Sequence, residues 1–234
     1  MNHSENALVI FARVPVPGRV KTRLSPAYSA EEACEIHRAL VADVVERSAR
    51  AVAGRADLFL AWSDPAAAGS AADPLPSGVV VESQGPGDLG ERMAFAMQGK
   101  LRAGYRRTVL LGSDSPTLPA DHLLAAFDAL READVVLGPS DDGGYYLVGM
   151  SRLHVEIFRG IEWGSDGVLG ATRARLKRSG TPYIDLGMWH DVDTPEDVAR
   201  LYEDLRRMKA RRAPDFPART YATLTRLAAS RHGR

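Results

Sequence analysis

The sequence predicts an α/β fold with a mainly parallel central sheet. The first observation is that short apolar runs of buried-strand type alternate along the chain with longer segments of helical periodicity. The second is that several of these runs end abruptly in loops rich in glycine, proline and aspartate. The clearest example is Val109-Leu110-Leu111, which runs directly into Gly112-Ser113-Asp114-Ser115-Pro116. Ligands of open α/β sheets bind at the carboxyl ends of the strands, so these loops are where a functional site is expected.

Composition limits the classes of function. The chain has 234 residues, 45% of them hydrophobic and 26% charged, which is typical of a globular protein. We predict one domain over residues 1–234, with a core of about 7–209 and a C-terminal tail of 210–234 that holds one helix. The formal net charge is zero, so neither nucleic acid nor an anionic membrane is expected as a partner. The single cysteine, Cys34, excludes a disulfide within the chain.

The amino terminus lacks the basic and apolar regions of a signal peptide, and no apolar run approaches the roughly 18 residues of a membrane-spanning helix. A cytoplasmic location is therefore expected. The oligomeric state cannot be predicted.

The order of the expected elements follows from the periodicity. Helix starts have recognisable signals, of which Thr194 as N-cap and Pro195 at the first helical position are the clearest. Residues 64–78 are rich in alanine, glycine, serine and proline and are expected to form a surface loop. Strands are expected at 7–12, 56–62, 79–81, 109–111, 134–137, 147–149 and 182–186, and helices at about 30–52, 93–102, 119–131, 167–177 and 195–209.

The loop after the first strand combines cations with a glycine. Arg13, Arg19, Lys21 and Arg23 surround Gly18, and two prolines prevent regular structure there. Phosphate groups are bound by such cations together with backbone amides that glycine leaves accessible. The segment is not a P-loop, because the required glycines are absent. The alternatives are a phosphate-binding loop and an ordinary solvated basic loop.

Three aspartates follow predicted strands and are expected at one edge of the sheet. They are Asp114, Asp191 and Asp193, and the last two have the spacing that places both side chains on one side of an extended backbone. Oxygen ligands beside phosphate-binding cations suit Mg²⁺ or Mn²⁺ rather than zinc. The alternative roles are a salt bridge for Asp191 and helix capping for Asp193.

Two further loops are candidates for ligand binding. The first contains Gly87, in a glycine-rich segment that suits close contact between backbone and ligand. The second runs from Asp141 to Tyr146, where two acids precede paired glycines and tyrosines. Such a segment binds sugar hydroxyls, stacks on a ring or supplies a base, but it also matches a hairpin turn. Its candidate residues are Asp141, Asp142, Gly143, Gly144 and Tyr145.

Four segments taken together resemble one superfamily. They are V-I-F-A-R-V-P-V-P-G-R-V-K-T-R-L, L-L-G-S-D-S-P, G-P-S-D-D-G-G-Y-Y-L and H-D-V-D-T-P-E-D. In this order they resemble the nucleotide-diphospho-sugar transferases, most closely the radical-SAM/selenodomain-associated transferases of the arsenosugar-pathway type. They are more distantly similar to phospholactate and molybdenum-cofactor guanylyltransferases. The resemblance covers about residues 7–205.

The resemblance implies a GT-A-type, Rossmann-like three-layer sandwich. It also implies that Asp114 takes the place of the metal- and nucleotide-associated aspartate, with Asp191 and Asp193 as the second ligand pair and Lys21 and Arg23 as the basic residues of the first loop. Two departures stand out. Pro-Val-Pro-Gly replaces the glycine-rich loop common in the nucleotidyltransferases, and Ser113-Asp114-Ser115 replaces the Asp-x-Asp triplet usual in GT-A glycosyltransferases.

The favoured hypothesis is a metal-dependent transferase that takes a sugar from a nucleotide-diphospho-sugar to a small-molecule acceptor. In it, Asp114, Asp191 and Asp193 hold Mg²⁺ or Mn²⁺, and Lys21 and Arg23, with Arg13 and Arg19, neutralise the leaving phosphates. Asp141 or Asp142 positions or deprotonates the acceptor. The alternative is nucleotidyl transfer from an NTP to a phosphorylated small molecule, and a second alternative is a non-catalytic nucleotide-binding module.

Overall fold

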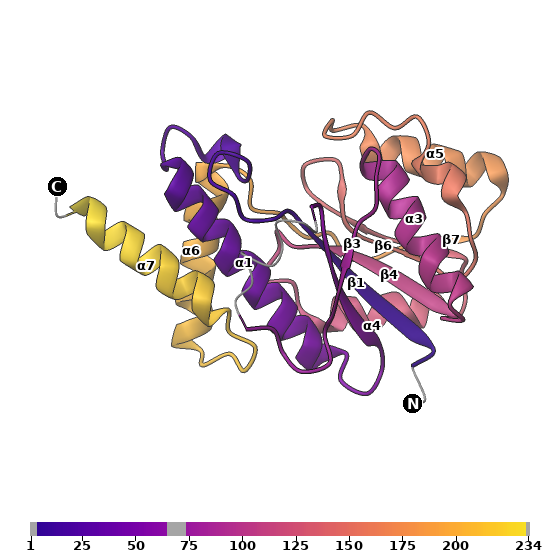
Figure 1. Cartoon of the computed structure of the whole chain (residues 1–234), viewed down its shortest axis with the longest axis horizontal. Helices are drawn as coiled ribbons and strands as arrows, with labels where there is room; N and C mark the ends of the chain where they lie inside the picture. Colours follow the sequence, from indigo (N-terminus) through magenta and orange to yellow (C-terminus); the bar gives the residue numbers. More distant parts are fainter. Residues whose placement is uncertain (1–3, 65–73, 233–234) are drawn as a thin grey trace.

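The fold is built on one twisted sheet. The structure is a computed structural model that describes residues 4–64 and 74–232. Within these residues the chain forms a seven-stranded sheet in the order β3-β2-β1-β4-β6-β5-β7. All neighbouring strands are parallel except that β6 runs antiparallel to both β4 and β5. The predicted α/β class with a mainly parallel sheet is thus confirmed (Figure 1).

The strand bounds agree closely with the apolar runs. Boundaries differ by one or two residues. The strands are β1 (Asn6–Ala12), β2 (Asp57–Trp62), β3 (Val80–Ser83), β4 (Arg107–Gly112), β5 (Val135–Pro139), β6 (Tyr145–Met150) and β7 (Tyr183–Asp185).

Helices connect and cover the strands. Part of the loop expected at 64–78 lies outside the described residues. The helices are η1 (Thr22–Leu24), α1 (Ala30–Ala51), α3 (Leu89–Arg102), α4 (Ala120–Ala129), η2 (Val155–Phe158), α5 (Val168–Ser179), α6 (Pro195–Ala210) and α7 (Ala218–His232). Three of these helices, α1, α3 and α6, begin with a complete capping box, and the one at Thr194 confirms the helix start predicted there.

The direction of β6 follows from the length of its connection. Only residues 140–144 join β5 to β6, which is too short for a crossover, so the two strands form an antiparallel hairpin. By contrast, the connection from β1 to its parallel neighbour β2 contains the long helix α1. The strand order reverses around β1, which lies between β2 and β4. In sheets of this kind, the point of reversal is where a crevice opens at the carboxyl ends of the strands.

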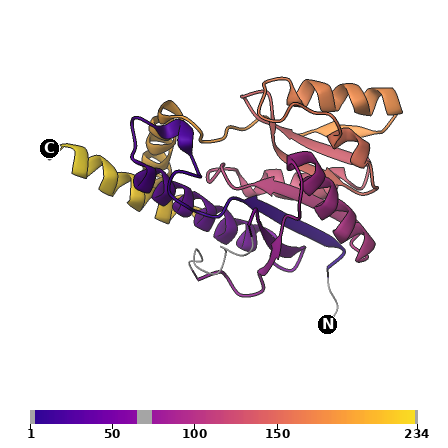
Figure 2. The same cartoon turned by 45° about the horizontal axis from the view of Figure 1, so that its top comes forward.

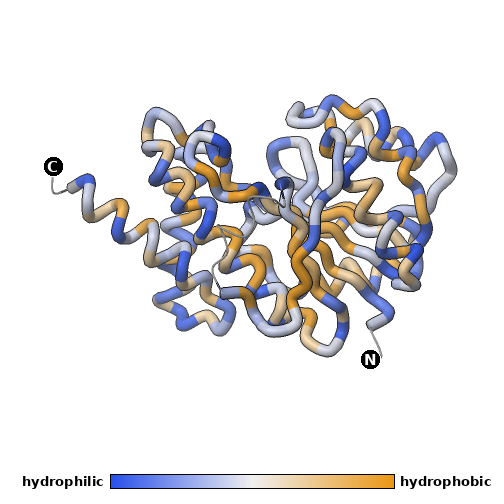
Figure 3. The backbone as a smooth tube through the Cα atoms, viewed as in Figure 1, coloured by the Kyte–Doolittle hydropathy of each residue, from blue (hydrophilic) through white to orange (hydrophobic). Residues whose placement is uncertain are grey.

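Helices cover both faces of the sheet and produce two apolar cores. On one face, side chains of α1 and α4 such as Val45 and Phe127 pack on the strands. On the other, side chains of α3, η2 and α5 such as Met97, Ile157 and Leu176 do so. Figures 1 and 2 show these layers, and Figure 3 shows the apolar strands enclosed between them. The result is the three-layer arrangement that the sequence resemblance implies.

A third apolar cluster lies outside these layers. Helices α6 and α7 pack together on α1, as Figure 1 shows, rather than on the sheet. Leu40 of α1, Leu201 of α6 and Leu227 of α7 are among its buried members. The C-terminal helix is therefore part of a packed unit that also includes Leu24 of η1 and Val192, which lies just before α6.

One buried arginine ties this unit to the loop after β4. The Arg47 side chain is only 8% exposed. Its guanidinium donates hydrogen bonds to the carbonyl oxygens of Pro116 and Leu118, the latter at 3.0 Å. It also pairs at 2.6 Å with Asp215, which lies between α6 and α7. The guanidinium of Arg47 thus joins the loop that carries Asp114 to this packed unit.

Replacing Arg47 with Met should lower the free energy of unfolding by about 3 kcal/mol, because two buried carbonyls and a carboxylate lose their donor. Urea unfolding measures the change. The matched control is Arg50→Met on the same helix, where the side chain is 55% exposed and pairs only with Glu46. It should cost less than about 0.5 kcal/mol. Equal losses in the two variants would contradict the role given to Arg47.

Candidate functional site

A large polar cavity opens at the carboxyl ends of β1, β2 and β4, beside the point where the strand order reverses. Its volume is about 640 Å³. The loop after β1, the start of α3, the loop after β4 and the segment before α6 all contribute to its lining. We call it the charged cavity, and its charged lining residues are Arg13, Lys21, Arg23, Asp88, Arg92, Asp114 and Asp193.

Lys21 is the central residue of the charged cavity. Its side chain is only 5% exposed, and Nζ lies 2.8 Å from an oxygen of Asp114 and 2.8 Å from an oxygen of Asp193. Its backbone adopts the left-handed conformation, with φ of 47°, at the start of η1. A residue other than glycine rarely adopts this conformation, and such strain is concentrated at functional sites. The fold therefore constrains the backbone to place this ammonium between two carboxylates.

Lys21 and its carboxylate partners each stabilise the charged form of the other. Burial alone would lower the pKa of Lys21, but the carboxylates of Asp114 and Asp193 raise it above its ordinary value. Burial would conversely raise the pKa of Asp114, and the positive charge of Lys21 holds it below its ordinary value. Lys21 and Asp114 are therefore both charged at neutral pH. Arg23 adds a second cation, with Nη1 3.7 Å from Asp193.

A buried histidine lies behind Asp114. Nε2 of His37 is 2.9 Å from the carbonyl oxygen of Arg13, and Nδ1 is 3.9 Å from Asp114. Burial lowers the pKa of His37, so its imidazole is neutral at pH 7. The ring is therefore held by the first basic loop through Nε2, with Nδ1 facing the carboxylate of Asp114 without a hydrogen bond.

Asp191 lies beside this group without sharing its cation. Its carboxylate accepts a hydrogen bond from the hydroxyl of Ser115. Burial, together with the nearby negative charge of Asp114, raises the pKa of Asp191 to about 7. In the part of the chain that the structure describes, no three carboxylate, thiol or imidazole side chains are gathered closely enough to hold a metal. Asp114 and Asp193 share the ammonium of Lys21 instead.

A second, mainly apolar cavity adjoins the charged one. Its volume is about 200 Å³, and it lies over β4 and β6 beneath α3 and the start of α5. We call it the apolar cavity. The two cavities share Phe11, Leu89, Gly112 and Gly164 as lining residues, so they adjoin each other. Asp191 lines the apolar cavity, and Asp193 lines the charged one. Between them, the backbone amide of Val192 donates a hydrogen bond to the carbonyl oxygen of Asp114.

The predicted substrate-binding segment is the β5–β6 hairpin turn. Asp142, Gly144 and Tyr145 line the apolar cavity. Asp141 does not, since it pairs at 3.0 Å with Arg200 on α6. Gly143 has φ of 87°, and a Cβ there would lie 2.1 Å from the carbonyl oxygen of Asp166. The hairpin interpretation is therefore right for the backbone, and it leaves Asp142 at the cavity.

Only some of the predicted phosphate-binding residues line the charged cavity. Arg13, Lys21, Arg23 and Gly87 line the charged cavity. Gly18 and Arg19 are exposed and do not line it. They occupy the bend of the loop, where Gly18 has φ of 74°. The prolines of this loop thus direct some of its cations inward and leave Arg19 toward solvent.

Several lining residues escaped the sequence analysis, among them His37, Gln84 and Arg92. His37 was hidden in the apolar stripe of α1, where a polar residue on the buried face was the available signal. Gln84 is buried and donates through Nε2 to the carbonyl oxygens of Ala12 and Ala61, fixing the ends of β1 and β2. Arg92 lies on the first turn of α3 after the glycine-rich loop. No motif distinguishes these two from structural residues.

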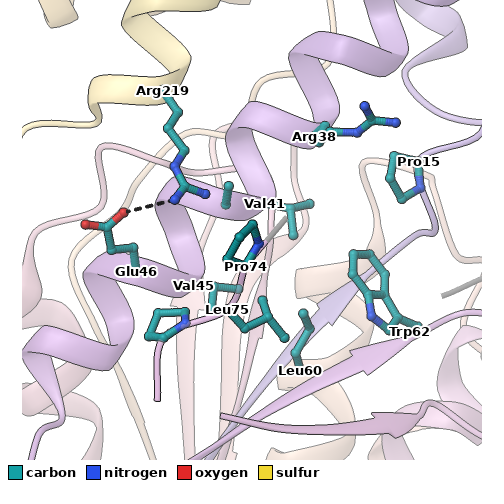
Figure 4. A pocket seen from close by; sticks show the side chains of 12 residues that line it. Pro15, Arg38, Val41, Val45, Glu46, Leu60, Trp62, Pro74, Leu75 and Arg219 are labelled. Carbon is teal, nitrogen blue, oxygen red and sulfur yellow. Dashed lines mark ion pairs between the residues drawn. The ribbon is translucent and has the colours of Figure 1, made fainter. Parts of the chain in front are cut away.

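A third cavity, of about 290 Å³, lies between α1 and β2 (Figure 4). Its walls include Val41, Leu60 and Trp62, and Glu46 lies 3.9 Å from Arg219 beside it. Part of its lining directly follows residues 65–73, which are outside the described part of the chain. We assign no function to this cavity.

The fold is similar to that of solved nucleotide-using transferases. A protein from Desulfovibrio desulfuricans G20, provisionally named a nucleotide-diphospho-sugar transferase, is 34% identical, with a TM-score of 0.84 over 97% of this chain and 96% of that one. CMP:2-keto-3-deoxy-manno-octonic acid synthetase complexed with CTP has a TM-score of 0.55 at 16% identity, over 89% and 100%. Rv0371c from Mycobacterium tuberculosis H37Rv, in complex with manganese, has a TM-score of 0.51 at 24% identity, over 86% and 100%. The last two show the fold alone.

A family model also matches the chain. The match covers residues 45–165, just over half of the sequence, and the family is DUF2064, "Uncharacterized protein conserved in bacteria". The chain therefore belongs to DUF2064 and is a relative of the D. desulfuricans protein. The matched range includes Asp114 and the β5–β6 hairpin, but neither Lys21 nor Asp193. No curated protein matches the chain.

The described helices offer no route across a membrane. None combines the length and the apolar character that a span requires.

Replacing Asp191 with Asn should stabilise the metal-free protein at pH 8. The pKa of Asp191 rises from 3.8 to about 7 on folding, so keeping this group ionised costs stability. The cost is absent below the unfolded pKa and grows until the pH passes the folded one. The variant should therefore gain about 2 kcal/mol at pH 8 and nothing near pH 4.

Urea unfolding at both pH values, with EDTA present, measures this gain. Asp128→Asn, at a side chain 70% exposed, is the control and should show no gain at either pH. A loss of stability in Asp191→Asn at pH 8 would contradict the electrostatic account of this site.

Proposed function

We propose that this protein is a metal-dependent glycosyltransferase that uses a nucleotide-diphospho-sugar as donor. The observation that carries the proposal is the Lys21 ammonium held between Asp114 and Asp193, at the carboxyl ends of the strands where the strand order reverses. This position is where nucleotides bind in sheets of this type. The similarity to the D. desulfuricans protein supports the same class of donor.

The cations of the charged cavity suit a diphosphate. Arg13, Lys21, Arg23 and Arg92 line it, and Gly87 brings backbone close to the same space. Arginine binds phosphate oxygens through two parallel hydrogen bonds, whereas lysine acts as a point charge. In glycosyl transfer the leaving group is a nucleoside diphosphate, on which negative charge develops. These residues would stabilise that charge in the transition state.

The carboxylates supply the oxygen donors that a hard divalent cation prefers. Asp114 and Asp193 already share one positive charge, the ammonium of Lys21, and Asp191 lies beside them, where burial and the negative charge of Asp114 raise its pKa. Oxygen donors of this type suit Mg²⁺ or Mn²⁺. Asp114, Asp193 and Asp191 would hold such an ion, which when bound neutralises the phosphates of the donor. The manganese complex of Rv0371c supports this choice of ion.

The acceptor would enter through the apolar cavity. That cavity adjoins the charged one, so a molecule in it would lie beside the end of a bound donor. Asp142 would position the acceptor hydroxyl or accept its proton. Asp141 is engaged with Arg200 and is the weaker candidate for this role.

Nucleotidyl transfer is the second candidate. Four cations in one cavity also suit the triphosphate of an NTP, and the fold is shared with a synthetase complexed with CTP. In that reaction the acceptor would be a phosphorylated small molecule and the same metal would bind the triphosphate. The resemblance to the radical-SAM/selenodomain-associated transferases favours glycosyl transfer. A non-catalytic nucleotide-binding module would bind the nucleotide but would turn over neither a nucleotide-sugar nor an NTP.

A thermal-shift screen distinguishes these functions, because a ligand of the native state raises the melting temperature by mass action. UDP-sugars, GDP-sugars and free NTPs are each tested with and without Mn²⁺ or Mg²⁺. We expect metal-dependent stabilisation by one nucleotide-sugar. Stabilisation by an NTP alone would favour nucleotidyl transfer, and no stabilisation by any nucleotide would contradict the proposed site.

Replacing Arg23 with Gln should weaken binding of the matching nucleoside diphosphate about tenfold, because a phosphate loses one charge-assisted contact. Calorimetric titration measures the affinity. Arg19→Gln is the matched control, since this arginine belongs to the same loop but does not line the cavity. It should stay within about twofold of the wild type. Similar losses in both variants would indicate non-specific electrostatic attraction.

Replacing Asp114 with Asn should abolish turnover of the donor found in the screen, since the proposed metal loses a charged ligand. Turnover is measured as release of the nucleoside diphosphate. A variant with full turnover would contradict the metal-ligand role of Asp114.

A further inference from the structure

The apolar cavity differs from the charged cavity in the sign of its charge. Of the described residues that line it, none is Lys or Arg, and its two charged side chains are Asp142 and Asp191. The four cations Arg13, Lys21, Arg23 and Arg92 all line the charged cavity instead. The boundary between the two runs through Phe11, Leu89, Gly112 and Gly164. A ligand that crosses it passes from a phosphate-binding environment to one that repels anions.

Both carboxylates have one oxygen fixed by the protein. Oδ1 of Asp142 accepts hydrogen bonds from the Ser140 hydroxyl and, at 2.9 Å, from the Gly144 amide. Oδ1 of Asp191 accepts from the Ser115 hydroxyl. Within residues 4–64 and 74–232, no protein group donates a hydrogen bond to Oδ2 of either residue. An ionised carboxylate only accepts, so a ligand that satisfies Oδ2 of Asp142 must bring a hydroxyl or amine donor.

The rest of the wall is apolar and partly aromatic. Tyr145 and Trp163 both line the cavity, and their rings meet edge to face with centroids 6.4 Å apart. Trp163 is held closely, because a Cβ at Gly90 would lie 2.8 Å from its Nε1. Met93 and Val168 complete the apolar lining. Apolar walls with a few fixed polar groups are typical of sites that bind a small molecule and orient it.

We propose that the apolar cavity binds an uncharged, hydroxyl-bearing ring and excludes phosphate monoesters. The proposal rests on the glycosyltransferase function proposed above and narrows its substrate class. The ring is either the sugar of the donor or the acceptor, since both present C–H faces to aromatic walls and hydroxyls to carboxylates. A phosphorylated acceptor would place two negative charges beside Asp142, in a cavity whose described lining contains no Lys or Arg.

Ligand-observed NMR on the full chain tests this, by saturation transfer from protein to ligand. The neutral probe is methyl β-D-glucopyranoside and the phosphorylated probe is D-glucose 1-phosphate, each at about 10 mM to detect millimolar affinity. The charged cavity is first saturated with Mg²⁺ and the nucleoside diphosphate found in the thermal-shift screen. Binding of the phosphorylated probe among the arginines is thereby blocked. We expect saturation transfer to the neutral probe alone.

Variants locate the binding. Asp142→Asn keeps an oxygen for the Gly144 amide but removes the charge, and it should weaken binding of the neutral probe about tenfold. It should leave the affinity for the nucleoside diphosphate unchanged, which shows that the variant is folded. Asp128→Asn, on the surface of α4, is the matched control and should change neither affinity. Ser165→Arg, which adds a cation at the cavity, should admit glucose 1-phosphate.

The two sources of the ring are separated by exchanging the nucleoside diphosphate for the intact nucleotide-sugar. Displacement of the neutral probe would assign the cavity to the sugar of the donor. Retention of the probe would assign the cavity to the acceptor. Either result supports the proposal.

The proposal is overturned if glucose 1-phosphate binds the wild type beside the nucleotide, if the neutral probe shows no transfer, or if Asp142→Asn leaves its affinity unchanged. Failure of the proposed function is a separate result, because it would appear as the absence of nucleotide binding to the charged cavity.

Discussion

The structure around the site depends on one interaction, the ammonium of Lys21 between the carboxylates of Asp114 and Asp193. These residues belong to the loop after β1, the loop after β4 and the segment before α6, so one cation joins three distant parts of the chain. Removing the ammonium of Lys21 from water is costly, and only close pairing with carboxylates offsets the cost. The fold therefore has to bring the three segments to the same point, and the left-handed backbone at Lys21 shows that it does so under strain.

The same interaction explains why two cavities of opposite character lie side by side. Cations gather where β1 and β2 end, while the β5–β6 hairpin brings a carboxylate and aromatic rings over β4 and β6. The segment with Asp191, Val192 and Asp193 runs along the boundary and contributes one carboxylate to each cavity. A phosphate-binding part and an uncharged part, joined at the carboxyl edge of the sheet, are what transfer of a neutral group from a nucleotide donor requires.

Much of this could be predicted from the sequence, because the positions of the strands along the chain and the composition of the loops are local properties. Apolar runs predicted the strands, and the loops after them carried Lys21, Asp114 and Asp193, which the structure brings together.

The features that could not be predicted from the sequence depend on tertiary contacts. Asp141 and Asp142 are neighbours with the same side chain, yet one pairs with Arg200 and the other lines a cavity. His37 is hidden in an apolar helix stripe, and its partner Arg13 is known only once α1 is packed on the sheet. Arg19 lies in the same basic loop as Lys21 but does not line the cavity, which residue type alone cannot reveal.

The central claim is that the charged cavity binds a divalent cation and the phosphates of a nucleotide at Asp114, Asp193 and Lys21. Anomalous diffraction at the manganese edge, from crystals grown with Mn²⁺ and the nucleotide found in the thermal-shift screen, tests it most directly. The account predicts one manganese peak in contact with Asp114 and Asp193, with the ammonium of Lys21 bonded to a phosphate oxygen. A nucleotide bound elsewhere, or a cavity in which Lys21 keeps both carboxylates and no manganese peak appears, would contradict it.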